Sequence, residues 1–511
     1  MPSRTRIVLS RRGFLQAAAA TTALAPLGLA ACGDDPVLPP GGDPVPVPPL
    51  LDGELIDGVR VFRLTIAAGT VEWVAGAPTA TIGVNGAYLG PTLHFRRGER
   101  VRLEVTNQLA EVTSLHWHGM ELPARADGGP YQPIAPGATW ISEYDVVQPA
   151  ATTWYHAHPM HSTGRHVYLG LAGLIVIEDP AATVELPMTY GVDDLPLVIQ
   201  DRRLFADGTH PYSAGGEPAM HDMMAGLRGA TILVNGVIEP TGEVPRGLVR
   251  LRVLNGANAR AYHLGFADDR PFVQIASDGG LLPAPVTTTR ALLGPGERAE
   301  LLVDFGADPA GATVELRSYS GEAFGSLFTG MMGANLADSL DRATFAIMTF
   351  TVGAAPHHAL TAPTALPPIA RMTEADAVRT RTLALSMGMG AVAINGVRMM
   401  DLDVVPAEVD FRIPTGDTEL WRVTNSSGMA HPLHVHHRQF QILDVDGRPP
   451  APALAGWKDT VLVGPGQVVR LMIRFAGVAD PTYPFMFHCH ILEHEDMGMM
   501  GRFFLVAPTP A

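Results

Sequence analysis

Short stretches in which apolar and polar residues alternate recur along the chain from about residue 55 onward. In the segments 101–107 and 249–255, Val and Leu take every second position between polar residues. A period of two is typical of strands that have one face on an apolar core. Gly and Pro, at 54 and 44 positions, separate these stretches and indicate frequent turns. The pattern predicts an all-β chain with few, short helices.

A longer pattern occurs three times: an apolar residue with Asn-Gly, then a turn-rich stretch, then an alternating strand that ends in Asn. The copies run from Asn85 to Asn107, from Asn235 to Asn255 and from Asn395 to Asn425. Three copies predict three similar domains, each a Greek-key β-sandwich. We expect these domains at 53–182, 183–355 and 379–511, with a Pro-, Ala- and Thr-rich linker at 356–378.

The first 52 residues carry export features. Arg11-Arg12 before an Ala-rich apolar stretch is similar to a twin-arginine signal peptide, placed at 1–31; such signals export folded cargo. Leu29-Ala30-Ala31-Cys32 resembles a lipobox, so Cys32 is the expected lipidation site, with an ordinary cleavage site as the alternative. Residues 32–52 would form a Pro/Gly tether. We therefore expect the protein in the periplasm or cell envelope, touching a membrane only through that lipid.

Charge and cysteine content exclude two classes of protein. The formal net charge of −15 would repel the phosphates of nucleic acid, so no nucleic-acid partner is expected. The only cysteines are Cys32, in the export region, and Cys489, near the C-terminus, which excludes a disulfide scaffold. Cys489 therefore needs an explanation of its own.

Histidines occur in pairs separated by one residue. The chain has 19 His, for which chance gives roughly 0.7 such pairs. Four are present: His116 with His118, His156 with His158, His434 with His436, and His488 with His490. Residues i and i+2 of a strand share a face about 7 Å apart, so each pair can serve two neighbouring metals. Eight imidazoles without a carboxylate cluster favour Cu, Zn, Fe or Ni over Mg or Ca.

Cys489 indicates which of these four metals fits best. It lies between His488 and His490, so its sulfur faces the opposite side of the strand. His494, Met499 and the preceding His431 can join it. Two imidazoles, one thiolate and a weak thioether are the ligands of a blue-copper electron-transfer site. A closed zinc tetrahedron would not use the thioether.

These motifs resemble those of the multicopper oxidases, which include laccases and cuprous oxidases. The similarity runs from about residue 55 to 506 through His-Trp-His-Gly, Trp-Tyr-His-Ala-His, His-Pro-Leu-His-Val-His and His-Cys-His-Ile-Leu-Glu-His-Glu-Asp-Met-Gly-Met. It implies three cupredoxin domains and four copper ions. The implied ligands are His431, Cys489, His494 and Met499 for the type 1 copper; His116 and His434 for the type 2 copper; His118, His156 and His490 for one type 3 copper; and His158, His436 and His488 for the other.

The resemblance also implies a reaction: one-electron oxidation of phenols, aromatic amines or metal ions, coupled to four-electron reduction of O2 to water. Asp127 matches the family's carboxylate near the cluster, and Glu495 matches its proton-relay acid. Asp496 is expected to be structural. His437 stands where the family usually has Gly, and we interpret it as a residue at the rim. We expect the protein to act as a monomer.

Three alternatives stay open. A dedicated cuprous oxidase would use Met387 and Met429 to bind a substrate copper. However, the family's Met-rich insert is missing and Ser427 stands where one carboxylate would be. Without that lid we expect an open type 1 edge that favours bulky phenolic or aromatic-amine donors.

The second alternative, of a different class, is a non-catalytic copper-binding or envelope scaffold protein. Family members that became structural have lost ligands, and here all twelve ligand positions are filled. The third alternative is a copper nitrite reductase, which needs only a single type 2 copper and would leave the four His pairs unexplained.

Overall fold

The computed structural model describes residues 42–213, 216–388 and 390–508. The predicted signal peptide, the predicted lipidation site Cys32 and the beginning of the predicted tether lie outside these residues. In the described ranges, no helix is both long and apolar enough to cross a membrane. Strands are the most extensive regular structure of the described chain, as the alternating pattern predicted.

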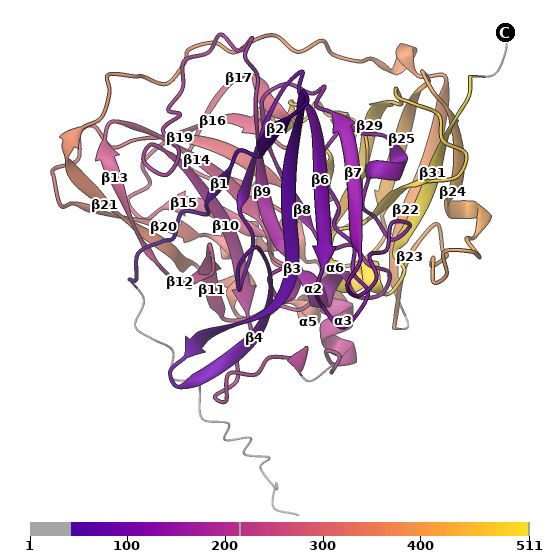
Figure 1. Ribbon diagram of the computed structural model, residues 1–511, viewed down its shortest axis with the longest axis horizontal. Coiled ribbons are helices and arrows are strands. Elements are labelled where there is room, and N and C mark those ends of the chain that lie inside the picture. The colour runs from indigo at the N-terminus through magenta and orange to yellow at the C-terminus, as the bar shows by residue number, and fades with distance from the viewer. Residues whose placement is uncertain (1–41, 214–215, 389, 509–511) are drawn as a thin grey trace, which may run out of the picture. The chain divides into compact units, whose positions relative to one another are not determined.

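The first segment, residues 50–178, forms two sheets (Figure 1). One has the order β1 (Leu50–Leu51), β5 (Thr92–Arg96), β9 (Ala172–Glu178), β8 (Ala151–His156). The other has the order β2 (Glu54–Ile56), β3 (Val59–Val74), β6 (Arg100–Asn107), β7 (Thr139–Asp145), and β4 (Ala77–Val84) pairs with β3. The alternation at 101–105 corresponds to β6, whose Val101, Leu103 and Val105 are buried.

The middle segment, residues 194–356, also forms two sheets. The larger has the order β12 (Val237–Ile238), β11 (Thr231–Val234), β10 (Asp194–Arg202), β14 (Leu248–Asn255), β19 (Arg298–Asp304), β16 (Phe272–Ser277), β17 (Gly280–Thr288). The smaller has the order β13 (Thr241–Arg246), β21 (Phe345–Pro356), β20 (Thr313–Ser318), β15 (Tyr262–Phe266), β18 (Ala291–Leu293). These strands enclose an apolar core of their own.

The third segment, residues 379–506, repeats the arrangement. One sheet has the order β23 (Ala391–Ile394), β22 (Arg379–Gly388), β25 (Thr418–Asn425), β29 (Val468–Arg474), β27 (Phe440–Val445). The other has the order β24 (Asp410–Pro414), β31 (Met500–Val506), β30 (Phe485–Cys489), β26 (His431–Val435), β28 (Thr460–Val463). The predicted fold class, consecutive cupredoxin-like β-sandwiches, is confirmed; the domain boundaries stay a prediction.

Helices are short and lie in the connections. In the described part of the chain, the α-helices are α2 (Thr163–Tyr168), α3 (Met220–Ala225), α4 (Ser320–Leu327), α5 (Gly330–Leu336) and α6 (Leu492–Asp496). The 3-10 turns of the same residues are η1 (Ala124–Ala126), η3 (Leu340–Arg342), η4 (Glu374–Asp376), η5 (Ala407–Val409) and η6 (Pro452–Leu454). Of these elements, α3 and α6 lie next to the candidate metal centre.

One apolar core joins the first and third segments and thereby places the histidines. A single buried cluster includes side chains of both segments, from Phe62 to Leu505. In the third segment, β26 and β30 are neighbours in one sheet, and His434 is the register partner of His488. In the first segment, His116 forms a bridge with His156. Backbone pairing therefore places the first His pair beside the second, and the third beside the fourth.

Residues 42–52 differ from the free tether that their Pro and Gly content suggested. Val45 donates its N–H to the carbonyl oxygen of Thr241 at 2.7 Å, and Thr92 donates to that of Pro49 at 2.9 Å. Leu50 and Leu51 pair in parallel with β5. Proline lacks an N–H but keeps a carbonyl acceptor, so a Pro-rich segment can still lie along a sheet edge.

Candidate metal centre

The predicted type 1 residues lie together in the third segment. His431, Cys489 and His494 place one ligand atom each within 4.8 Å of one another. The sulfur of Cys489 is 3.4 Å from Nδ1 of His431 and 3.7 Å from Nδ1 of His494. Met499 is buried in the same core and is tied to this group by its backbone, since Cys489 donates its N–H to the Met499 carbonyl oxygen at 3.0 Å.

The remaining nitrogens of the two imidazoles are held away from the sulfur. Nε2 of His431 is 2.9 Å from the hydroxyl of Ser427, and Nε2 of His494 is 3.0 Å from the carbonyl oxygen of Met224 in α3. These partners favour the tautomer with the proton on Nε2, which leaves both Nδ1 atoms as ligands. Burial raises the pKa of the Cys489 thiol, which only a bound cation would offset.

The expectation of an open type 1 edge is wrong. His431 and His494 are fully buried. Helix α3 covers His494 through Met224, and the segment 327–329 covers the chain before His431, because Ala430 donates its N–H to the Leu327 carbonyl oxygen at 2.7 Å. The expectation considered only the missing insert, whereas these covering residues come from the middle segment.

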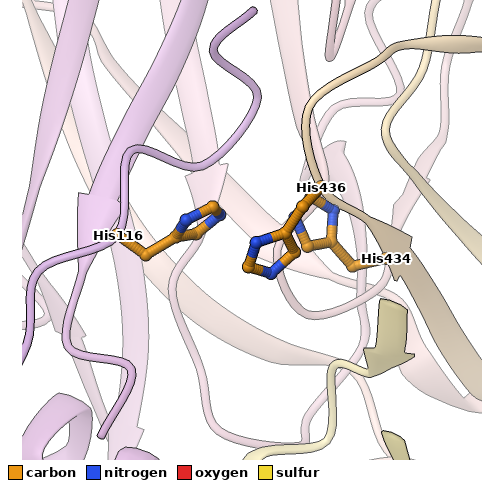
Figure 2. Close-up of side chains that lie close together, drawn as sticks. All are labelled: His116, His434 and His436. Atoms are coloured by element: carbon orange, nitrogen blue, oxygen red, sulfur yellow. The ribbon is translucent and has the colours of Figure 1, made fainter. Parts of the chain in front are cut away.

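The eight histidines of the four pairs form one buried cluster between the first and third segments. Each is at most 1% exposed. Figure 2 shows the ring of His116, from the first segment, facing those of His434 and His436. The rings of His116 and His436 stack at 3.8 Å, and those of His118 and His434 at 3.6 Å. Sequence positions more than 300 residues apart thus meet at one point.

One predicted type 3 set is brought together as a unit. His158, His436 and His488 form one potential metal-binding group, with Nε2 of His488 lying 3.2 Å from Nε2 of each of the other two. Three nitrogens at such separations can coordinate one ion.

The other predicted sets are grouped differently. His116 gathers with His434 and His436, and also with His118 and His156. The ring of His490 lies 5.1 Å from that of His118 and 5.3 Å from that of His156.

Backbone carbonyls lie at the Nδ1 atoms of four of the rings, with Nδ1 of His488 lying 3.1 Å from the Cys489 carbonyl oxygen. Nδ1 of His116 donates to the Asp127 carbonyl oxygen at 2.9 Å, Nδ1 of His156 to that of Ala157 at 2.8 Å, and Nδ1 of His434 to that of Asp459 at 2.9 Å. Their Nε2 atoms then carry no proton and face the cluster.

Several nitrogens of the cluster have no partner. Nε2 of His116, Nε2 of His434 and both nitrogens of His490 lack hydrogen bonds within the described residues. Buried unpaired acceptors are costly, and metal ions would satisfy them. The donor set therefore fits copper.

Asp127 and Glu495, the two predicted proton carriers, contact the cluster directly. The carboxylate of Asp127 accepts from Nδ1 of His436 at 2.8 Å. That of Glu495 lies 3.1 Å from Nδ1 of His158 and 3.1 Å from Nδ1 of His488. Burial raises the pKa of Asp127 well above its usual range. Both carboxylates can orient ligands, and Asp127 is suited to hold a proton at neutral pH.

Two further residues that the sequence singled out, His437 and Asp496, lie next to the centre. His437 is buried rather than at the rim, with its ring stacked on Phe485 at 4.3 Å. Its φ of 74° is one that glycine adopts without strain, which accounts for the Gly usual at this place. Asp496 has a structural role, since it accepts the N–H groups of Thr163 and Gly164 in α2 at 2.8 and 2.9 Å.

Met387 and Met429 both pack at the core of the third segment. Met429 is fully buried and Met387 is partly buried. The sequence reasoning missed Ser427, Asp459 and Thr460 as partners of ligand histidines. No spacing marks such residues, because their contacts depend on the folded chain.

Comparisons with known proteins agree with this geometry. Two family models, both described as multicopper oxidase, match residues 65–182 and 372–508. The multicopper oxidase mco of Staphylococcus aureus is 32% identical over 467 residues, covering 90% of this chain and 92% of that protein. The cell division protein FtsP of Escherichia coli strain K12 is 36% identical over 505 residues, covering 98% of this chain and 100% of that protein.

A solved structure extends the similarity to the fold. The laccase-like multicopper oxidase CueO from the lignin-degrading bacterium Ochrobactrum sp. is 37% identical, with a TM-score of 0.80, and the match covers 91% of this chain and 100% of that one. A multicopper oxidase from Pediococcus acidilactici is 33% identical with the same TM-score, covering 93% of this chain and 94% of that one. The chain belongs to the multicopper oxidase family.

Proposed function

We propose that this protein is an oxidase that takes single electrons from a reducing donor and uses four of them to reduce O2 to water. The observation that carries the proposal is the position of Cys489, whose sulfur lies with His431 and His494 while its neighbours His488 and His490 lie in the histidine cluster. Four copper ions would be held by the twelve ligands assigned above. Bound copper supplies the electron storage and the O2 reduction.

The protein's own residues do three things in this scheme. The chain from His488 to His490 connects the two centres through covalent bonds. Ser427 and the Met224 carbonyl fix the imidazoles on the electron-entry side. Asp127 and Glu495, in contact with ligand rings, are placed to relay the protons that O2 reduction consumes.

Glu495→Gln tests this role. An amide would direct an N–H donor at an imidazole Nδ1–H that now meets a carboxylate oxygen, so we expect turnover to fall about 10- to 100-fold. The blue absorption should stay, since His431 and Cys489 have other partners. O2 consumption and visible spectra of copper-loaded protein measure both. Asp496→Asn is the matched control and should keep turnover; equal losses in both variants would contradict a specific role of Glu495.

The covered type 1 edge changes the expected donor. Bulky phenols or aromatic amines cannot approach a fully buried His494 without movement of α3. Three methionines on α3 and on α5, which directly follows the covering segment 327–329, are exposed instead: Met220 on α3 at 64%, and Met331 and Met332 on α5 at 83% and 58%. Thioethers bind Cu(I) well. Within the proposed oxidase, the geometry therefore favours small metal ions such as Cu(I) as donors, with laccase-like oxidation of phenols and aromatic amines second.

A donor panel measured by O2 consumption checks this ranking. We expect kcat/KM for Cu(I) to exceed that for a bulky phenol, and replacement of Met220, Met331 and Met332 by Ser to lower the Cu(I) value about tenfold. The same replacements should leave the phenol value unchanged. Met188→Ser, at a 72% exposed position between the first and middle segments, is the control. A higher value for the phenol would restore the laccase-like ranking.

The similarity to FtsP supports a scaffold function as the other candidate. That relative matches essentially the whole chain and is named a cell division protein. A scaffold would need the fold but not turnover. Copper-loaded protein that consumes no O2 with any donor of the panel would favour the scaffold function.

Export and lipid attachment remain part of the proposal. We infer a periplasmic or envelope location from the twin-arginine pattern and a lipid at Cys32 from the lipobox. Mass spectrometry of the mature N-terminus tests both.

A further inference from the structure

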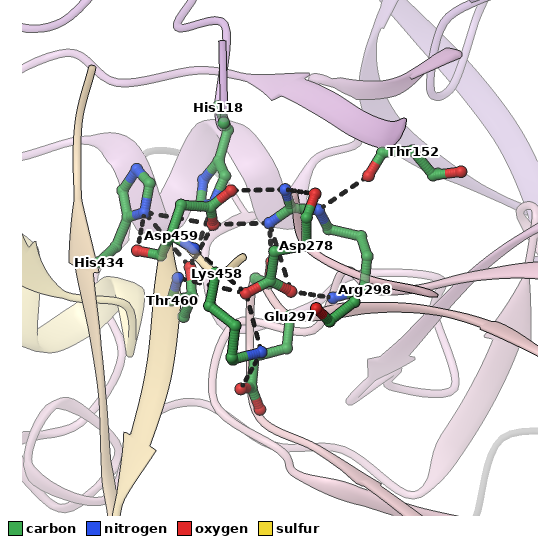
Figure 3. A network of polar contacts seen from close by, with 12 residues as sticks. His118, Thr152, Asp278, Glu297, Arg298, His434, Lys458, Asp459 and Thr460 are labelled. Atoms are coloured by element: carbon green, nitrogen blue, oxygen red, sulfur yellow. Dashed lines mark hydrogen bonds and ion pairs between the residues drawn. The ribbon is translucent and has the colours of Figure 1, made fainter. Parts of the chain in front are cut away.

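A buried network of charges connects the middle segment to the histidine cluster (Figure 3). Its centre is Arg298, the first residue of β19, which is fully buried. The guanidinium donates to both carboxylate oxygens of Asp459, at 2.7 and 2.6 Å. It also donates to the carbonyl oxygens of Asp278 at 2.9 Å and of Thr152, in β8, at 3.2 Å. One side chain of the middle segment thus contacts both segments that carry ligands.

Asp459 connects Arg298 to two ligand rings. Its carboxylate lies 2.9 Å from Nε2 of His118, and its carbonyl oxygen accepts from Nδ1 of His434 at 2.9 Å. The hydroxyl of Thr460 donates to the same carboxylate at 2.9 Å and lies 3.2 Å from both of those nitrogens. The position of Asp459 therefore affects two rings that stack on each other.

Asp459 also decides which nitrogen of His118 can bind metal. The carboxylate accepts a hydrogen bond from Nε2–H, so the free lone pair of the ring is on Nδ1. Nδ1 in turn lies 3.3 Å from Nε2 of His156, a separation that two ligands of one ion have. His116, His156 and His434 present Nε2 instead, because a carbonyl binds their Nδ1. His118 is thus turned the opposite way.

Further buried charged residues surround Arg298 and hold it in place. The carboxylate of Asp278 accepts the backbone N–H of Arg298 at 2.8 Å and lies 2.9 Å from Nζ of Lys458, which is 3.0 Å from Glu297. These five charged side chains are at most 4% exposed. A buried ion network contributes little net stability compared with apolar packing, because its desolvation is costly. The contacts of Arg298 and Asp459 with the ligand rings point instead to an effect on position.

We infer that Arg298 is a positioning residue for the proposed three-copper cluster: through Asp459 it holds His118 with Nδ1 toward the metal and fixes His434 beside it. The inference rests on the proposed function for the presence of copper. It assigns a task to the middle segment, which contributes none of the assigned copper ligands.

Arg298→Lys is the test. Lysine keeps the positive charge but cannot bind both oxygens of Asp459 and the two carbonyls together. Apo protein would be titrated with copper ions, and bound copper, the electron paramagnetic resonance of the type 2 copper and the blue absorption would be recorded. We expect affinity for the three cluster coppers to fall about 10- to 100-fold, with the blue absorption unchanged.

Arg260→Lys is the matched control. Arg260 is an equally buried arginine of the middle segment that pairs with Asp201, Asp338 and Asp341, none of them assigned to copper. This variant should bind cluster copper as the unaltered protein does. Equal losses in the two variants, or a wild-type type 2 signal in Arg298→Lys, would overturn the inference.

A second variant tests the inference if Arg298→Lys does not fold. Asp459→Asn keeps the shape of the side chain but weakens its hold on Arg298 and His118, and should show the same selective loss. Wild-type binding of cluster copper by Asp459→Asn would overturn the inference. If the unaltered protein binds no copper, the proposed function fails instead, so the two failures are distinguishable.

Discussion

Cys489→Ser is expected to remove the blue absorption and to stop oxidation of every donor, a loss of more than about 100-fold in turnover. Cys489 is the only cysteine of the described chain, and its sulfur lies 3.4 Å from Nδ1 of His431 and 3.7 Å from Nδ1 of His494. A serine hydroxyl is a hard, weak ligand for copper and cannot replace it. Visible spectra and O2 consumption of copper-loaded protein measure the two effects.

The other coppers should stay bound in this variant, since His488 and His490 are unchanged. Copper analysis should therefore find about three ions per chain instead of four. Met499→Leu is the matched control, because leucine conserves the volume of the weak axial ligand and should leave the blue absorption in place. A Cys489→Ser protein that stays blue would refute the assignment of the sulfur.

The fold was largely predictable because its signals are local. Alternation at 101–105 and 249–253 predicts strands, and both segments form them. Only β6 has the expected single buried face, because in β14 the polar positions are buried too, where Arg250 pairs with Glu300 and Arg252 with Asp194. The histidine pairs were predictable for the same reason: the residues between them, Trp117, Ala157, Val435 and Cys489, must point away. The spacing could not show that His116 would meet His436, which depends on the core shared by the first and third segments.

What the sequence could not show lies in contacts between segments. The cover over His494 comes from α3, and the carboxylate beside His118 comes from Asp459, 341 positions away. No spacing of residues in the sequence predicts either contact, because each depends on how the sandwiches pack against one another. The rim position expected for His437 failed likewise, since Phe485 covers a ring that looked exposed from its place after the third motif.

Removal of copper should make the protein sensitive to mild acid. Burial lowers the pKa of nine of the ten candidate ligand histidines, to about 3 for His156 and about 4 for His494. In the unfolded chain the same rings titrate near pH 6.5. Below that pH the unfolded state binds more protons, so the free energy of unfolding falls as pH falls, by up to about 1.4 kcal/mol per pH unit for each ring.

Thermal unfolding of apo protein between pH 7 and 5 measures this effect, and Tm should drop steeply across that range. Carboxyl groups whose pKa values burial raises act in the opposite direction, but they are fewer than the nine rings: Glu121, Asp127, Glu239, Glu297, Asp459, Glu493 and Asp496. The Tm of copper-loaded protein should change little between pH 7 and 5, because the metal binds the neutral rings of the folded state only. His490→Gln removes one buried ring and should reduce the slope, whereas His221→Gln, on the exposed face of α3, should not. If the Tm of apo protein stays constant from pH 7 to 5, these rings are not held buried and neutral. The ligand cluster would then not be formed before copper binds.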